Sequence, residues 1–149
     1  MKKMIFYLIF LSLMACKKTP MVDCNSPTKD SDIASQLIEG KWSWKYSNYF
    51  NRRESKYEIW TPENRKSIKT MEFKSDGSLY IFENGKLVTE TKFEFKKLSA
   101  LTNFPADSTR YILSWKDSNT TFRICSDSLY LPYQSFGYDA AADEVWEKQ

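Results

Sequence analysis

The sequence predicts an all-β protein, an eight-stranded antiparallel up-and-down barrel that follows one short helix. After Gly40, apolar and polar residues alternate with the period of a half-exposed strand. Turn signals such as Asn84-Gly85 separate the alternating runs, and no βαβ alternation is present. Aromatic residues make up 16% of the chain, which is typical of small β-domains. A closed barrel leaves no free edge strand, and a β-sandwich built from the same strands is the alternative.

The chain opens with the pattern of a secretory signal peptide. Met1-Lys2-Lys3 is basic, and residues 4–14 form an apolar run of eleven residues that ends before Ala15. A helix needs about 20 apolar residues to cross a bilayer, so this run fits an h-region better than a membrane span.

Leu13-Met14-Ala15-Cys16 resembles the lipobox of bacterial lipoproteins. The resemblance implies cleavage before Cys16 and acylation of Cys16 with palmitate-like chains, so that the protein is held on a membrane. It divides the chain into a signal peptide (1–15), a lipidated tether (16–30) and a domain (31–149). Lys17 after Cys16 implies that the protein is sorted to the outer membrane of the cell envelope. Which face of that membrane it occupies is left open. An ordinary signal peptide with a chance cysteine is the alternative.

The elements of the domain follow from local patterns. Residues 30–40 predict a short amphipathic helix, which Asp30 or Ser31 caps and Gly40 ends. Eight strands are predicted at 41–49, 67–74, 78–83, 86–97, 109–116, 121–126, 128–133 and 143–149. Residues 50–66 are polar and contain Pro62, so they predict a long loop that can include a short strand at 57–60.

Composition excludes several classes of function. The chain has no histidine, so it lacks imidazole bases, Ser/His and Cys/His pairs and histidine metal sites. After loss of the leader, 20 basic residues face 19 acidic ones, which argues against a nucleic-acid partner. Asp139, Asp143 and Glu144 lack calcium-loop spacing and predict a solvated turn. The sequence therefore predicts no enzyme, no metal site and no cofactor.

Two cysteines remain once Cys16 is assigned to lipid. Cys24 lies in the tether, and Cys125 follows Phe122 and Ile124, which share one face of a strand. Cys125 is therefore expected to point outward, where the tether can reach it. In an oxidising compartment the two thiols predict a disulfide, and two free thiols are the alternative.

Gly40-Lys41-Trp42, which opens the first strand after the short helix, resembles the Gly-x-Trp signature of lipocalins. Residues 73–88 are similar to the second and third strands of lipocalin-like bacterial lipoproteins. The resemblance implies that Trp42 closes the barrel floor, with Lys148 as the basic residue available to stack on it. It also places the stretch 49–66 at the position of the lipocalin lid.

Two groups of residues are candidates for ligand binding. The candidate interior set consists of Trp44, Tyr46, Met71, Phe73, Phe93, Tyr111, Leu113 and Trp115. The candidate lid set consists of Tyr49, Phe50, Arg52, Arg53, Tyr57 and Trp60. They predict an anchored protein that binds a small apolar or amphipathic ligand. The alternative is a filled barrel that acts on an envelope protein through its surface, as an inhibitor or accessory subunit.

Overall fold

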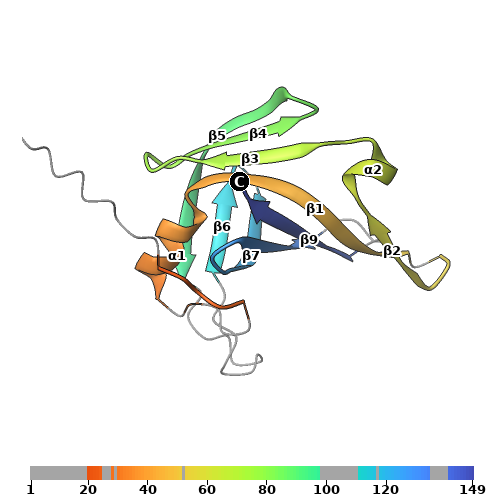
Figure 1. The fold of residues 1–149 in the computed structure, drawn as a ribbon, viewed down its shortest axis with the longest axis horizontal. Helices are drawn as coiled ribbons and strands as arrows, with labels where there is room; N and C mark the ends of the chain where they lie inside the picture. The colour runs from red at the N-terminus through yellow and green to blue at the C-terminus, as the bar shows by residue number, and fades with distance from the viewer. Residues whose placement is uncertain are drawn as a thin grey trace, which may run out of the picture.

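The computed structural model describes residues 20–24, 28, 30–51, 53–97, 111–116, 118–134 and 141–149 (Figure 1). Its elements in chain order are α1 (Ser31–Ile38), β1 (Gly40–Asn51), β2 (Lys56–Trp60), α2 (Pro62–Arg65), β3 (Lys69–Phe73), β4 (Ser78–Glu83), β5 (Lys86–Lys97), β6 (Tyr111–Trp115), β7 (Ser118–Ile124), β8 (Ser128–Gln134) and β9 (Ala141–Lys148). The predicted helix and the eight predicted strands are present, β2 contains the short strand offered at 57–60, and α2 is an addition.

The eight predicted strands form a closed antiparallel barrel. Each strand pairs with the next along the chain from β3 to β9, and β1 joins the two ends of this series. Along one edge β1 pairs with β9 from Trp42 to Tyr49, and along the other it pairs with β3 from Gly40 to Ser43. The β1–β9 pairing closes the sheet, so the predicted barrel is confirmed and the sandwich alternative is wrong.

The two ends of the barrel are different (Figure 1). At the closed end, α1 lies beside the start of β1 and the end of β9. At the opposite end, which we call the mouth, β1 continues beyond its pairing with β3 and pairs with β2 from Ser47 to Asn51. No helix in the described part of the chain is long and apolar enough to cross a membrane.

Helix α1 is held at its start by Asp30. The Asp30 side chain accepts hydrogen bonds from the backbone N–H groups of Asp32 and Ile33, at 2.8 and 3.3 Å. Ala34, Leu37 and Ile38 are buried and belong to the hydrophobic core of the barrel. The helix therefore covers the closed end with its apolar face.

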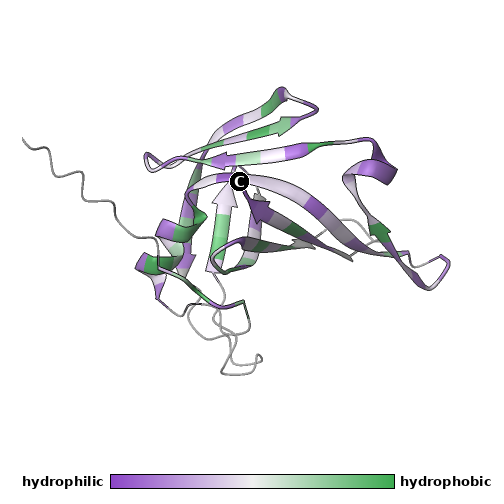
Figure 2. Cartoon of the chain, viewed as in Figure 1, coloured by the Kyte–Doolittle hydropathy of each residue, from purple (hydrophilic) through white to green (hydrophobic). Residues whose placement is uncertain are grey.

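The core is built from the inward face of the strands. Its strand residues are Trp42, Trp44, Met71, Phe73, Leu79, Tyr111, Leu113, Phe122, Ile124, Leu129, Leu131 and Trp146. In Figure 2, α1, β4 and β6 carry green segments, whereas β1 is mostly pale because tryptophan and tyrosine have intermediate hydropathy. Much of the core surface contributed by β1 is therefore aromatic rather than aliphatic.

A β-bulge in β1 overturns one prediction. The register against β9 shifts between Trp44 and Tyr46, so that Lys45 is an extra residue. Tyr46 is consequently 36% exposed on the outer face, and Ser47, at 3%, takes the inward position. The assignment of Tyr46 to the interior is wrong because strict alternation breaks at the bulge.

The predicted loop at 50–66 is wrong apart from the short strand at 57–60, which is part of β2. Residues 50 and 51 extend β1 beyond the predicted strand, and the Thr61 side chain caps α2 by accepting from the backbone N–H of Asn64. The resulting β1–β2 hairpin is a regular two-stranded extension of the barrel wall. Arg52 lies outside the described residues.

Candidate functional site

The closed end brings together the residues expected of a barrel floor. Trp42 is 0% exposed, and its indole Nε1–H donates to the Ile38 carbonyl at 2.7 Å. The Lys148 ammonium lies 5.3 Å from the centroid of the Trp42 ring and donates to the Leu37 carbonyl at 2.8 Å. These two side chains satisfy carbonyls at the C-terminal end of α1, and so join the helix to the barrel.

Gly40 is required at the junction between α1 and β1. Its φ of +115° lies in a region that residues with a Cβ rarely adopt, and an added Cβ would lie 3.3 Å from Lys148 Cε. The glycine of the Gly-x-Trp pattern thus gives both the turn and the space for the lysine.

The interior set, apart from Tyr46, faces the core. Trp44, Met71, Phe73, Tyr111 and Leu113 are buried, and Phe93 and Trp115 pack against the core while keeping partial exposure. Near the closed end the aromatic rings contact one another: the Phe95 and Tyr111 rings stack at 4.9 Å between centroids, and Tyr111 and Phe122 lie 5.5 Å apart. This half of the interior is occupied by side chains.

The mouth is lined by aromatic rings from the β1–β2 hairpin. Tyr49 stacks on Trp60 with 4.2 Å between the ring centroids, and the Arg65 guanidinium lies 4.3 Å from the Trp60 ring. Trp60 Nε1–H donates to Glu58 at 3.2 Å, and Trp60 packs against the core. Two members of the lid set therefore lie in a fixed stack at the mouth.

A pair of opposite charges lies inside the mouth, and the sequence analysis missed it. Glu144 pairs across the sheet with Ser47 and Leu131, which are buried, so its side chain shares their inward face. Lys69 alternates with the buried Met71, and its ammonium lies 3.9 Å from the Glu144 carboxylate and 5.1 Å from the Trp44 ring. The predicted solvated turn is therefore wrong for Glu144.

The surroundings of Glu144 act on its pKa in opposite directions. Burial raises the pKa of Glu144 above its ordinary value, while Lys69 and a 3.2 Å hydrogen bond from Trp146 Nε1–H oppose the rise. Its side chain is 19% exposed, and its neighbour Asp143 is exposed. Asp139 lies outside the described residues. The sequence pattern that could have revealed this inward position is the period-2 alternation of the last strand, which places Glu144 on the same face as Trp146.

The remaining described lid residues face away from the mouth. Phe50 and Tyr57 contact each other on the outer face of the hairpin, at 4.9 Å between ring centroids, and Tyr57 is 76% exposed. Ile59, on the same face, is 61% exposed, and Arg53 is exposed at the hairpin tip. The lid set is thus divided between two faces of one hairpin.

The two cysteines meet on the outside of the closed end. Cys24 and Cys125 form a disulfide, and Cys125 is 1% exposed although it is not part of the core cluster. Beside it the tether is hydrogen bonded to Ser126, whose N–H donates to the Val22 carbonyl at 3.2 Å and whose Oγ accepts from the Val22 N–H at 2.6 Å. Asp127 Oδ1 lies 3.7 Å from Cys24 Sγ, but both sulfur atoms are used in the covalent bond.

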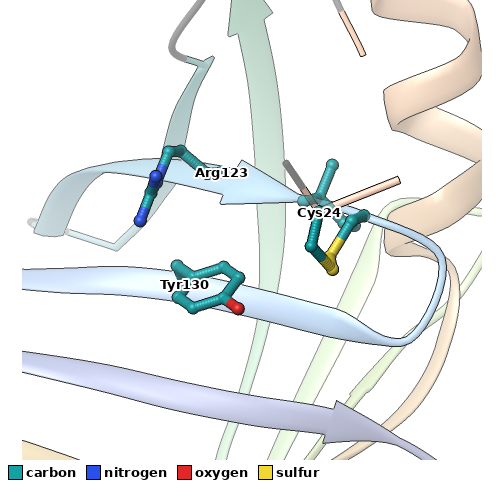
Figure 3. Close-up of a pocket in the computed structure, with 5 residues that line it drawn as sticks. Cys24, Arg123 and Tyr130 are labelled. Atoms are coloured by element: carbon teal, nitrogen blue, oxygen red, sulfur yellow. A yellow bond between two sulfur atoms is a disulfide. The ribbon is translucent and has the colours of Figure 1, made fainter. Parts of the chain in front are cut away.

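A small pocket lies beside this disulfide (Figure 3). Its volume is about 80 Å³, and it lies next to the Arg123 guanidinium, which is 4.9 Å from the Tyr130 ring on the neighbouring strand. Sites for organic ligands measure about 300–1,000 Å³, so this pocket is too small for one. The mouth, with its aromatic rings and its paired charges, is the stronger candidate site.

Comparisons with protein-family models, with curated proteins and with solved structures found no match to this chain.

Proposed function

We infer that the chain is a membrane-anchored, lipocalin-like lipoprotein whose barrel mouth binds a small apolar or amphipathic molecule. The observation that carries this inference is the Lys69–Glu144 pair on the inward face, beside the Trp44 ring, in a mouth that Trp60 also lines. Aromatic rings offer apolar contact, and a few charged groups orient a polar head. The separation of 3.9 Å is longer than a hydrogen bond, so the ammonium retains donors for a ligand.

The proposed anchor is Cys16, because it completes the lipobox pattern. Wild-type protein is expected in the membrane fraction with an acylated Cys16 at its N-terminus, since two or three acyl chains hold a protein far more strongly than one. Cys16→Ser is expected to release or mislocalise the protein. Fractionation followed by mass spectrometry of the N-terminal peptide measures both results. Soluble wild-type protein with an unmodified Cys16 still joined to Ala15 would disprove the anchor.

The proposed ligand site is tested with oleic acid as the probe. Five tryptophans lie in the chain, so an apolar molecule in the mouth is expected to quench their fluorescence. Lys69→Gln is expected to weaken oleic acid binding by about tenfold, because a charge-assisted contact to the carboxylate is lost. Titration by tryptophan quenching measures the dissociation constant of each variant.

Lys45→Gln is the matched control, because Lys45 is an exposed outer-face lysine of the same barrel that pairs with Glu147 at 2.5 Å. It is expected to bind oleic acid as the wild type does. No quenching by any apolar probe, or equal weakening in both variants, would reject the ligand site. The surface module would then take its place, and the exposed outer face of the hairpin, with Tyr57 and Ile59, is the observation that favours that second function.

A further inference from the structure

Strand β2 differs from the other strands in how its edges are used. Within the described residues, each of the eight barrel strands is paired on both sides, whereas β2 pairs with β1 alone. Its other edge borders an open groove of about 530 Å³ between β2 and α2, lined in part by Tyr57, Ile59 and Asn64. An unpaired edge is a ready template for another strand.

One hydrogen bond shows which backbone groups of β2 point to this free edge. Asn64 Nδ2 donates to the Ile59 carbonyl at 2.8 Å, so this carbonyl points away from β1 and toward α2. Because backbone groups alternate along a strand, the N–H and carbonyl of Tyr57 also point to the free edge. Asn64 therefore covers one end of the edge and leaves the centre, at Tyr57, accessible.

The side chains of β2 are self-complementary about Tyr57. Lys56 and Glu58 lie on one face of the strand, on either side of Tyr57, and Tyr57 is on the other face. An antiparallel second copy centred on Tyr57 places each Lys56 opposite the Glu58 of the other copy. Hydrogen bonds from Asn51 and Trp60 hold the pKa of Glu58 below its ordinary value, which keeps it charged.

A neighbouring register fits less well. If Tyr57 were opposite Ile59 of the other copy, the two Glu58 side chains would face each other, and like charges in that position are unfavourable. That register also requires the Ile59 carbonyl, which already accepts from Asn64. Charge and hydrogen bonding therefore select the register centred on Tyr57.

We propose that two copies of this chain pair through the free edges of their β2 strands, antiparallel about Tyr57. The two hairpins then form one continuous four-stranded sheet in the order β1–β2–β2–β1, and the exposed Tyr57 side chains lie opposite each other. A five-residue strand gives a small contact area, so the dimer is weak and forms at high local concentration.

The test uses charge exchange in two variants of the purified protein. Lys56→Glu gives both copies two acidic residues at the interface, and Glu58→Lys gives both two basic ones. Each variant alone is expected to associate about tenfold more weakly than the wild type. An equimolar mixture is expected to form the heterodimer in preference to either homodimer, because each acidic residue then faces a lysine. Sedimentation equilibrium measures association, and native mass spectrometry of the mixture measures the heterodimer.

The matched control exchanges the same pair of residue types on another strand. Glu94 and Lys96 on β5 are exposed, are also two residues apart and form an ion pair at 2.8 Å. Lys96→Glu and Glu94→Lys are expected to leave association at the wild-type level. Variants that are unfolded would not form the dimer when they are mixed. Near-UV circular dichroism checks that each variant is folded. A wild type that stays monomeric at all concentrations, or a mixture without heterodimer preference, would overturn the proposal.

Discussion

Replacing Trp42 by alanine is expected to lower the free energy of unfolding by about 3–5 kcal/mol, the usual cost of removing a buried tryptophan side chain. Trp42 is fully buried in the core cluster. The change also removes the N–H that donates to the Ile38 carbonyl and the ring beneath the Lys148 ammonium. Because both contacts lie where α1 meets the barrel, the loss is expected to detach the helix from the closed end.

Two further variants separate the causes of this loss. Trp42→Phe keeps a ring but leaves the buried Ile38 carbonyl without its donor, and is expected to cost about 1–3 kcal/mol. Trp60→Ala removes a partly buried ring at the mouth, so a smaller loss than that of Trp42→Ala is expected. Urea unfolding followed by circular dichroism measures all three variants. A Trp42→Ala variant within about 1 kcal/mol of the wild type would contradict a role for Trp42 in the floor.

Removing the disulfide is expected to give the second large effect. Cys24 and Cys125 are 101 residues apart, so the bond restricts a long loop of the unfolded chain. The chain-entropy model gives up to about 4.7 kcal/mol for such a loop, and measured losses are often smaller. The double variant Cys24→Ser, Cys125→Ala is the one to make, because alanine at the buried position 125 adds no unsatisfied hydroxyl.

The measurement compares urea unfolding of the oxidised wild type, the reduced wild type and the double variant. The last two are expected to agree with each other and to unfold at lower urea. Their m-values are expected to exceed that of the oxidised protein, because a chain without the cross-link exposes more surface when it unfolds. Two titratable thiols in oxidised, denatured wild-type protein would contradict the bond.

Much of the barrel was predictable because its signals are local. Period-2 alternation located the strands, Asn84-Gly85 located a hairpin, and Asp30 with Gly40 bounded the helix. The closure of the barrel was predicted from the need to remove free edges, and the β1–β9 pairing confirms it.

The errors have physical causes that alternation cannot reveal. The bulge at Lys45 depends on the register against β9, a strand almost one hundred residues away, so the outward turn of Tyr46 has no local signal. The turn of the β1–β2 hairpin uses Ser55 at a φ of +49° rather than a glycine, so no turn signal marked it. Glu144 occupies an inward position in spite of its charge, because Lys69 and Trp146 interact with its carboxylate.

If Cys16 is the anchor, the disulfide also limits how far the barrel can stand from a lipid surface. Cys24 follows the proposed anchor Cys16 by eight positions, and a chain of that length spans at most about 29 Å when fully stretched. Without the bond, the hydrogen bonds between Val22 and Ser126 still hold the tether at this end. Once these weaker contacts open, the next attachment toward the barrel is the Thr28 carbonyl, which accepts from Tyr111 Oη–H at 3.0 Å. The permitted height then rises to about 43 Å. Since the disulfide lies at the closed end, a tether anchored at Cys16 would keep that end beside the membrane and let the mouth and β2 point into the surrounding aqueous space.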